Sequence, residues 1–209
     1  VYHNWHGRQP PSLIGERNRM PIYAGYLALF YHPSMSDPEY FEVGKRANIY
    51  LSLVLLLLLG LIFWHRLPPL VAINLIGIVT FGWFIFKAGY TQPELLFYTL
   101  FFLAFLACWH LMRATPTARM LWLASVAGAL CGLAHLTKAA VPPLLAVFSL
   151  SFAGQSVMSL RAPPSSTGRR LGTIAWAGAA GLVFAIVFLA ILWPYLATNK
   201  RVFGRYFYN

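Results

Sequence analysis

The chain has 209 residues, of which 59% are hydrophobic, and its mean hydropathy is +0.63. Soluble domains need a polar coat, so this composition excludes an ordinary soluble globular fold. The formal charge of +11 comes from 16 Lys and Arg against 5 Asp and Glu. These cations lie between apolar runs, where they suit anionic lipid headgroups and membrane topology, and no nucleic-acid partner is expected.

The apolar runs are close to the roughly 20 residues that cross a bilayer as a helix. We therefore predict an all-α protein, a polytopic transmembrane helical bundle within residues 47–195. An external juxtamembrane segment, 1–46, precedes the bundle, and residues 196–209 begin a further external segment. The six expected spans are 47–64, 70–86, 94–112, 120–137, 142–160 and 171–193.

The first 46 residues are polar and rich in Pro and aromatic side chains. Within them, Met20–Tyr31 is apolar but too short to span, which indicates a helix lying in the membrane interface. The run Ser36–Glu39 is an N-cap pattern, since Ser or Asp accepts N–H groups while Pro and Glu suit the first turn. We expect a short helix from about Pro38 toward Lys45 that continues into the first span or hinges against it.

A short polar segment, Lys87–Glu94, separates the second and third spans. It carries a cation, a flexible Gly, a helix-breaking Pro and Glu94, the only carboxylate residue after Glu42. A charge at the end of a membrane helix is costly unless it faces water, a partner or a ligand. Pro93 at the first position of a helix and Glu94 beside its positive end explain both residues without any functional role. The alternative is that Lys87, Tyr90, Gln92 and Glu94 line a cavity.

Two features inside the spans point to packing. Gly128 and Gly132 form a GxxxG pair, which predicts a close helix–helix contact. Cys108 and Cys131 are expected to be buried free thiols, because Cys packs like a small hydrophobe. No metal-binding CxxC spacing is present, and no metal site is predicted, although a divalent metal is not excluded.

The connections between spans differ in charge. The loops after the first, third and fifth spans carry arginines, whereas the loops between them hold only Lys87 and Lys138. The positive-inside rule then places the arginine loops in the cytoplasm and 1–46, 87–94, 138–143 and 194–209 outside. The arginines concerned are Arg66, Arg113, Arg119, Arg161, Arg169 and Arg170.

Four cations on the outer side are candidates for contacting a ligand. Arg17 and Arg19 precede the interfacial helix and could clamp a lipid-linked phosphate or simply anchor in headgroups. Lys138 ends the fourth span, where the helix dipole also favours a cation. Lys87 could line the site or extend its ammonium toward water from an apolar surface.

Three short motifs stand out: Arg19–Tyr23 (RMPIY), Gln92–Glu94 (QPE) and Gly132–Lys138 (GLAHLTK). Together they resemble elements of the GT-C membrane glycosyltransferases, in the branch of protein O-mannosyltransferases and aminoarabinose transferases known as glycosyltransferase family 39. Arg19–Tyr23 (RMPIY) is similar to the Arg-x-Pro-[LI]-Tyr element of that group. Gly132–Lys138 (GLAHLTK) resembles its GLA-x-LTK helix end, and Gln92–Glu94 fits its third external turn. The resemblance covers essentially the whole chain, as an internal part of a larger enzyme.

This resemblance implies transfer of a sugar from a polyprenyl-phosphate donor, with no cofactor, on the external face of a membrane, in bacteria the periplasmic face of the inner membrane. The acceptor would be a protein, lipid or glycan. The catalytic base of the family, an acid after the first span, is expected upstream of Val1, with Glu16 a weaker candidate. Donor-phosphate binding would fall to Arg19, Arg17 and Lys138, and the cavity lining to Tyr23, Lys87, Tyr90, Gln92 and Glu94.

Two other functions remain open. A transporter or flippase for a lipid-linked or anionic solute would also need charges on a membrane protein, although such proteins often place charges mid-membrane and show repeated halves. This sequence has neither feature. A non-catalytic membrane scaffold is the third alternative, because the expected catalytic acid is absent from the chain.

Overall fold

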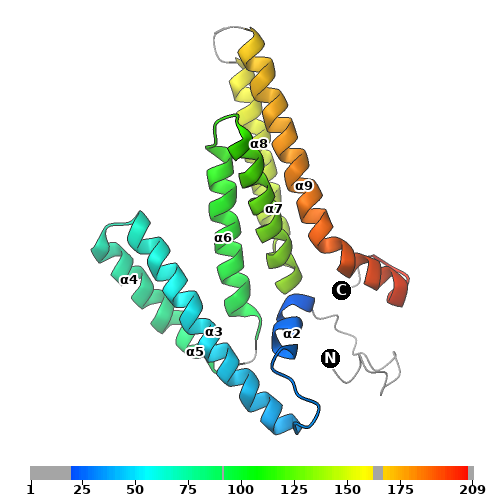
Figure 1. Cartoon of the computed structure of the whole chain (residues 1–209). Coiled ribbons are helices and arrows are strands. Elements are labelled where there is room, and N and C mark those ends of the chain that lie inside the picture. Colours follow the sequence, from blue (N-terminus) through cyan, green and yellow to red (C-terminus); the bar gives the residue numbers. More distant parts are fainter. Residues whose placement is uncertain (1–19, 91, 162–166, 207–209) are drawn as a thin grey trace. The chain divides into compact units, whose positions relative to one another are not determined.

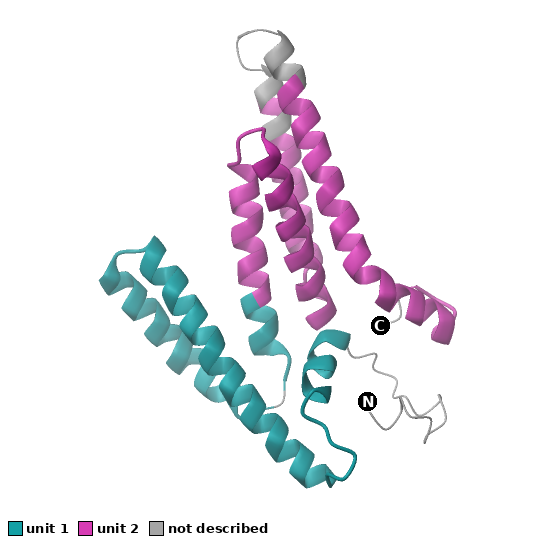
Figure 2. Ribbon diagram, viewed as in Figure 1, with its two compact units in different colours: residues 1–99, 209 teal, residues 100–208 magenta. Residues whose placement is uncertain are grey.

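The computed structural model describes residues 20–90, 92–161 and 167–206, and in them all regular structure is helical (Figure 1). The predicted all-α class is confirmed. Arg17, Arg19 and Glu16 lie outside the described residues. The chain divides into two compact units, residues 1–99 with 209 and residues 100–208 (Figure 2). The division falls inside one helix, between Thr99 and Leu100.

Unit 1 begins with helix α2, Pro21–Ala28, which starts with Pro at its first position and is shorter than the apolar run predicted. Helix α3, Asp37–Arg66, follows. The side chain of Ser36 accepts the backbone N–H of Glu39, and the Glu39 carboxylate accepts the N–H of Ser36 at 2.8 Å. This reciprocal capping box starts α3 at the predicted position. The short helix expected from Pro38 is continuous with the first span and has no hinge.

The second apolar run packs against α3 as a helical hairpin. Helix α4, Pro69–Val79, follows the Pro68-Pro69 break, and the chain continues through α5, Ile85–Ala88. Gly60 of α3 faces Ile76 of α4, and a methyl group at Gly60 would lie 3.7 Å from the Ile76 side chain. The two helices therefore pack in ordinary van der Waals contact here.

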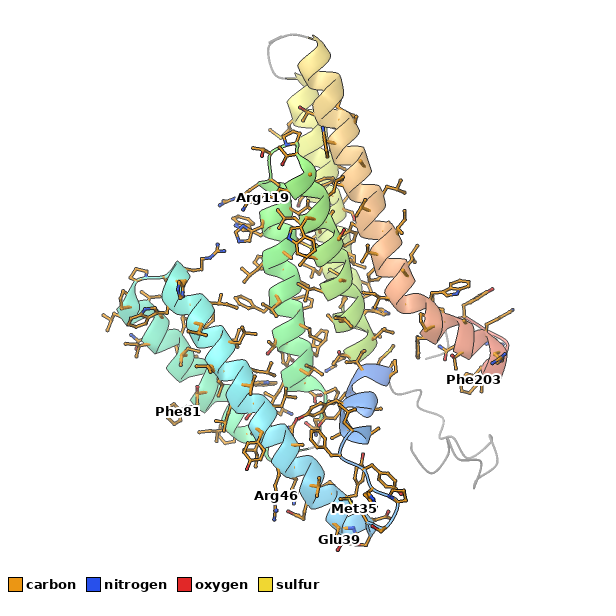
Figure 3. The ribbon with its side chains drawn as sticks, in the orientation of Figure 1. Met35, Glu39, Arg46, Phe81, Arg119 and Phe203 are labelled. Carbon is orange, nitrogen blue, oxygen red and sulfur yellow. The ribbon has the colours of Figure 1, made fainter. Side chains whose placement is uncertain are left out.

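The middle of this second run is not α-helical. Thr80–Phe84 forms a π-helical segment, η2, between α4 and α5. The sequence did not predict this change, although Gly82 within it lowers α-helical propensity. A π-helical turn adds a residue and rotates the side chains that follow. Phe81 of η2 is exposed (Figure 3). Phe84, at the end of the same segment, is buried.

Unit 2 contains most of α6, Glu94–Met112, and helices α7, Ala118–Thr137, α8, Pro142–Arg161, and α9, Thr167–Phe203. Its central packing is between α7 and α9. A methyl group built on Gly128 would lie 2.6 Å from the carbonyl oxygen of Phe184, and one on Gly132 would lie 2.9 Å from Ile191. The predicted GxxxG packing face is thus confirmed, and α9 is its partner.

Within the described residues, five helices are long and apolar enough to cross a membrane: α3, α4 with η2 and α5, α6, α7 and α9. The chain is accordingly an integral membrane protein. The described apolar part of α8, Pro142–Gly154, is shorter than a full span, so the fifth predicted span, 142–160, is not among the five. The last helix also differs from expectation, because α9 continues through Pro194 to Phe203 and does not end at Trp193.

Candidate functional site

The polar segment after α5 is held in place by one buried side chain, Asn48 of α3. Its amide nitrogen donates to the backbone carbonyls of Lys87, Ala88 and Tyr90 at 3.3, 3.2 and 2.8 Å. Asn48 is completely buried. Carbonyls at a helix C-terminus lack intrahelical partners, and here the Asn48 amide donates the hydrogen bonds that water would otherwise supply. The shape of the Lys87–Tyr90 turn is therefore fixed from α3.

Helix α2 joins the same arrangement through two tyrosines. The Tyr23 hydroxyl donates to Oδ1 of Asn48 at 3.3 Å, and the Tyr26 hydroxyl donates to the carbonyl of Ala47 at 2.7 Å. Their ring centroids lie 6.1 Å apart. We call the set Tyr23, Tyr26, Asn48, Lys87–Tyr90 and Gln92–Glu94 the Asn48 junction. All of it belongs to unit 1.

The charged and amide side chains of the turn interact with each other. Nζ of Lys87 donates to Oε1 of Gln92 at 3.1 Å and lies 5.4 Å from the ring centroid of Trp83. Both contacts stabilise the charged ammonium group of Lys87, whose side chain extends from the end of an apolar helix. Lys87 is half-buried, whereas the ring of Tyr90 is 60% exposed and can be reached by a ligand.

Glu94 is the first residue of α6, as predicted from its place after Pro93. Its carboxylate is close enough to affect Tyr23, which is buried. Burial is the main cause that raises the pKa of Tyr23 above its ordinary value, and the charges of Tyr26 and Glu94 raise it further. The phenol of Tyr23 is therefore kept neutral as a hydrogen-bond donor beside a carboxylate.

Lys138 belongs to unit 2 and is described separately. It caps the C-terminus of α7, where its backbone N–H donates to the carbonyl of Ala134 at 3.0 Å. Helix α7 ends at Thr137, the last residue of the expected fourth span. A cation at this position also complements the helix dipole, as the sequence alone indicated.

No family model, curated protein or solved structure matches this chain. The site must therefore be judged from its own residues.

The structure brings together five of the sequence-predicted site residues, namely Tyr23, Lys87, Tyr90, Gln92 and Glu94, around Asn48. The sequence reasoning missed Asn48 and Tyr26. A signal was present, because Asn48 and Ser52 are polar positions four residues apart in an otherwise apolar stretch and both are buried. Such residues in a membrane helix usually satisfy a partner on another element. Among the described residues no group of three or more His, Cys, Asp or Glu could hold a metal ion.

The junction combines groups suited to a polar, hydroxyl-rich ligand. Glu94 and the Gln92 carbonyl can accept hydrogen bonds, Lys87 and the tyrosine hydroxyls can donate them, and Tyr90 offers an exposed ring for stacking on a sugar face. Lys87 is also the one cation in the junction able to pair with a phosphate. The arrangement therefore fits recognition of a sugar or sugar phosphate better than an apolar ligand.

Proposed function

We propose that the chain is part of an integral membrane glycosyltransferase that moves a sugar from a polyprenyl-phosphate donor to an acceptor on the external, or periplasmic, face of the membrane. The observation that carries the proposal is the Asn48 junction. It brings a carboxylate, a cation, an amide and several tyrosines together at one end of an apolar helical hairpin, and this combination suits a ligand with a lipid tail and a polar sugar head.

The sequence motifs support the same function. RMPIY leads directly into α2 and contributes Tyr23 to the junction, and Gln92–Glu94 forms its other side. GLAHLTK ends α7 at Lys138, a helix C-terminus where an anionic donor group would meet a cation. Two motifs identified separately in the sequence thus contribute to one cluster in unit 1.

In this proposal the cations bind the donor and the junction binds its sugar. Arg19 and Arg17, which precede α2 in the sequence, neutralise the phosphate, whose charge grows as the glycosidic bond to it breaks. Lys87, Tyr90, Gln92 and Glu94 contact the sugar. A carboxylate base on the acceptor hydroxyl completes the reaction. Glu16 is the weaker candidate for this base, the main expectation being an acid upstream of Val1.

The test uses the full-length protein that contains this chain, reconstituted in proteoliposomes with radiolabelled polyprenyl-phosphate mannose and, separately, polyprenyl-phosphate aminoarabinose. Arg19→Ala should lower sugar transfer about 100-fold, the usual cost of losing one charge-stabilising donor. Arg46→Ala is the matched control, because Arg46 is an exposed arginine of α3 outside the junction. Normal transfer by Arg19→Ala at normal expression would contradict the proposal.

A flux measurement distinguishes a glycosyltransferase from the alternative, a flippase or transporter. The same proteoliposomes, loaded with either donor on one side, report movement of the lipid-linked sugar across the bilayer. Flux without transfer to any acceptor would identify a flippase or transporter and overturn the glycosyltransferase assignment. Transfer without flux supports the enzyme.

A further inference from the structure

The C-terminal part of α9 runs in a different direction from the membrane-spanning part that precedes it. Pro194 lies inside this helix, and Figure 1 shows that α9 bends in its C-terminal part. An internal proline removes one backbone hydrogen bond and clashes with the preceding turn, which bends the helix. The helix ends at Phe203, and Gly204 follows with φ of +71°, a left-handed conformation that favours glycine.

The bend determines how far from the hydrocarbon core of the bilayer the residues after Pro194 lie. Along a straight helix, Arg201 would be roughly 12 Å beyond Trp193. The headgroup layer on each side of a bilayer is only about 5–8 Å thick. A bend at Pro194 lets the chain run along this layer instead of leaving it. Trp193, 59% exposed at the end of the apolar run, is a typical residue of the membrane interface.

Three cations follow the bend, and they differ in what they do. Nζ of Lys200 donates to the carbonyl of Gly204 at 3.1 Å and lies 5.2 Å from the Tyr206 ring, so Lys200 closes the end of the helix. The buried Asn199 supports the same turn by donating to the carbonyl of Tyr206 at 3.4 Å. Arg201 and Arg205, on either side of Gly204, are exposed. The turn is braced by Lys200 and Asn199, and the two arginines extend from it.

Charge balance indicates the partner of these arginines. The sequence contains no Asp or Glu after Glu94, so unit 2 has no side-chain carboxylate to pair with them. Val202 and Tyr206, 49% and 46% exposed, lie beside them and suit the acyl boundary. Guanidinium groups bind phosphate oxygens in a bidentate manner, and juxtamembrane cations attract anionic lipids.

We propose that this turn, which carries Arg201, Val202, Arg205 and Tyr206, binds the phosphodiester headgroup of an anionic phospholipid, with Trp193 before the bend in the same membrane interface. The phosphate pairs with the two arginines, and the exposed Val202, Trp193 and Tyr206 contact the adjoining glycerol and upper acyl chain. The site is independent of the proposed sugar transfer and would exist in a transporter or a scaffold as well.

The test places the full-length protein in phosphatidylcholine nanodiscs with or without phosphatidylglycerol and counts retained phosphatidylglycerol by native mass spectrometry. R201Q/R205Q should weaken retention about 25-fold, at about fivefold for each juxtamembrane cation lost. R201K/R205K keeps the charge and should retain most of the binding. K45Q/R46Q removes the same charge from α3, where Lys45 is paired with Glu42, so its loss of retention should be clearly smaller than that of R201Q/R205Q.

Equal retention by R201Q/R205Q and the unchanged protein would overturn the proposal. So would an equal loss in K45Q/R46Q, which would show a general effect of net charge. A circular dichroism spectrum and a gel-filtration profile that match the unchanged protein exclude misfolding, which is not expected for exposed side chains. Displacement of phosphatidylglycerol by an equal mole fraction of decaprenyl phosphate would assign the turn to the sugar donor and overturn the phospholipid site.

Discussion

The side-chain amide of Asn48 donates a 2.8 Å hydrogen bond to the backbone carbonyl of Tyr90, 42 positions later in the chain. With the bonds to Lys87 and Ala88, this contact joins the start of the first span to the end of the second. The consequence is that a turn containing glycine and a charged residue has a defined shape. The residues proposed to contact sugar depend on that shape.

Replacing Asn48 with Ala should destabilise the protein by about 2–4 kcal/mol. Several carbonyls that Asn48 satisfies would lose their donor in a buried position, and each such loss costs about 1 kcal/mol or more. Thermal unfolding in detergent measures the change. Asn74→Ala is the matched control, because Asn74 is an exposed asparagine that donates only to Leu70 of its own helix in the described structure. Equal stability of the two variants would refute a structural role for the junction.

Replacing Gly128 with Ala should destabilise the packing of α7 against α9. The new methyl group would lie 2.6 Å from the carbonyl oxygen of Phe184, so one helix must move, at a cost of about 1–3 kcal/mol. Gly181→Ala on α9 is the control, because a methyl group there meets no atom within 4 Å among the described residues. That variant should be neutral or stabilised by up to about 1 kcal/mol. Thermal unfolding that ranks the two the other way would contradict the packing.

Replacing Ser36 with Ala should loosen the start of α3. The variant loses both hydrogen bonds of the Ser36 side chain with Glu39, and a lost N-cap costs about 1 kcal/mol. Amide hydrogen exchange should therefore become faster in the first turn of α3. Ser34→Ala removes a serine that bonds His32 outside the helix, and exchange in α3 should be unchanged. Unchanged exchange in Ser36→Ala would mean that packing alone starts the helix.

The raised pKa of Tyr23 predicts a loss of stability in alkali. Tyr23 holds its proton more tightly in the folded than in the unfolded chain, so this contribution is complete below a pH of about 10 and disappears as the pH rises toward the folded-state value. Above pH 10 the unchanged protein should lose stability more steeply than Tyr23→Phe, which cannot ionise. Tyr50→Phe, at a 68% exposed position, should keep the steep decline. Parallel declines in all three proteins would contradict the prediction.

The proposed sidedness can be tested by thiol labelling of intact cells. The native Cys108 and Cys131 are buried, so the parent protein should not react with a membrane-impermeant maleimide. Gly89→Cys, in the exposed turn of the junction, should be labelled from outside. Thr115→Cys, in the exposed α6–α7 turn, should be labelled only after the cells are opened. The reverse pattern would place the junction in the cytoplasm.

Local signals in the sequence were sufficient for most helix boundaries. The capping pattern at Ser36, the Pro68-Pro69 break and the Pro93-Glu94 start each act on neighbouring backbone groups, and the structure has helices at all three places. The GxxxG pair also identified a packing face. It could not identify α9 as the partner, because small residues on both helices permit a close approach without specifying which helices meet.

The composition of the chain determined that it is helical and lies in a membrane, since long apolar runs can satisfy their backbone groups in lipid only as helices. Tertiary structure alone decided that Asn48 organises the Lys87–Tyr90 turn, that the second span contains a π-helical segment and that α9 continues past Pro194. Each depends on contacts between residues distant in sequence or on a balance between packing and local helical preference. Neither the distant contacts nor this balance can be predicted from one short segment of the sequence.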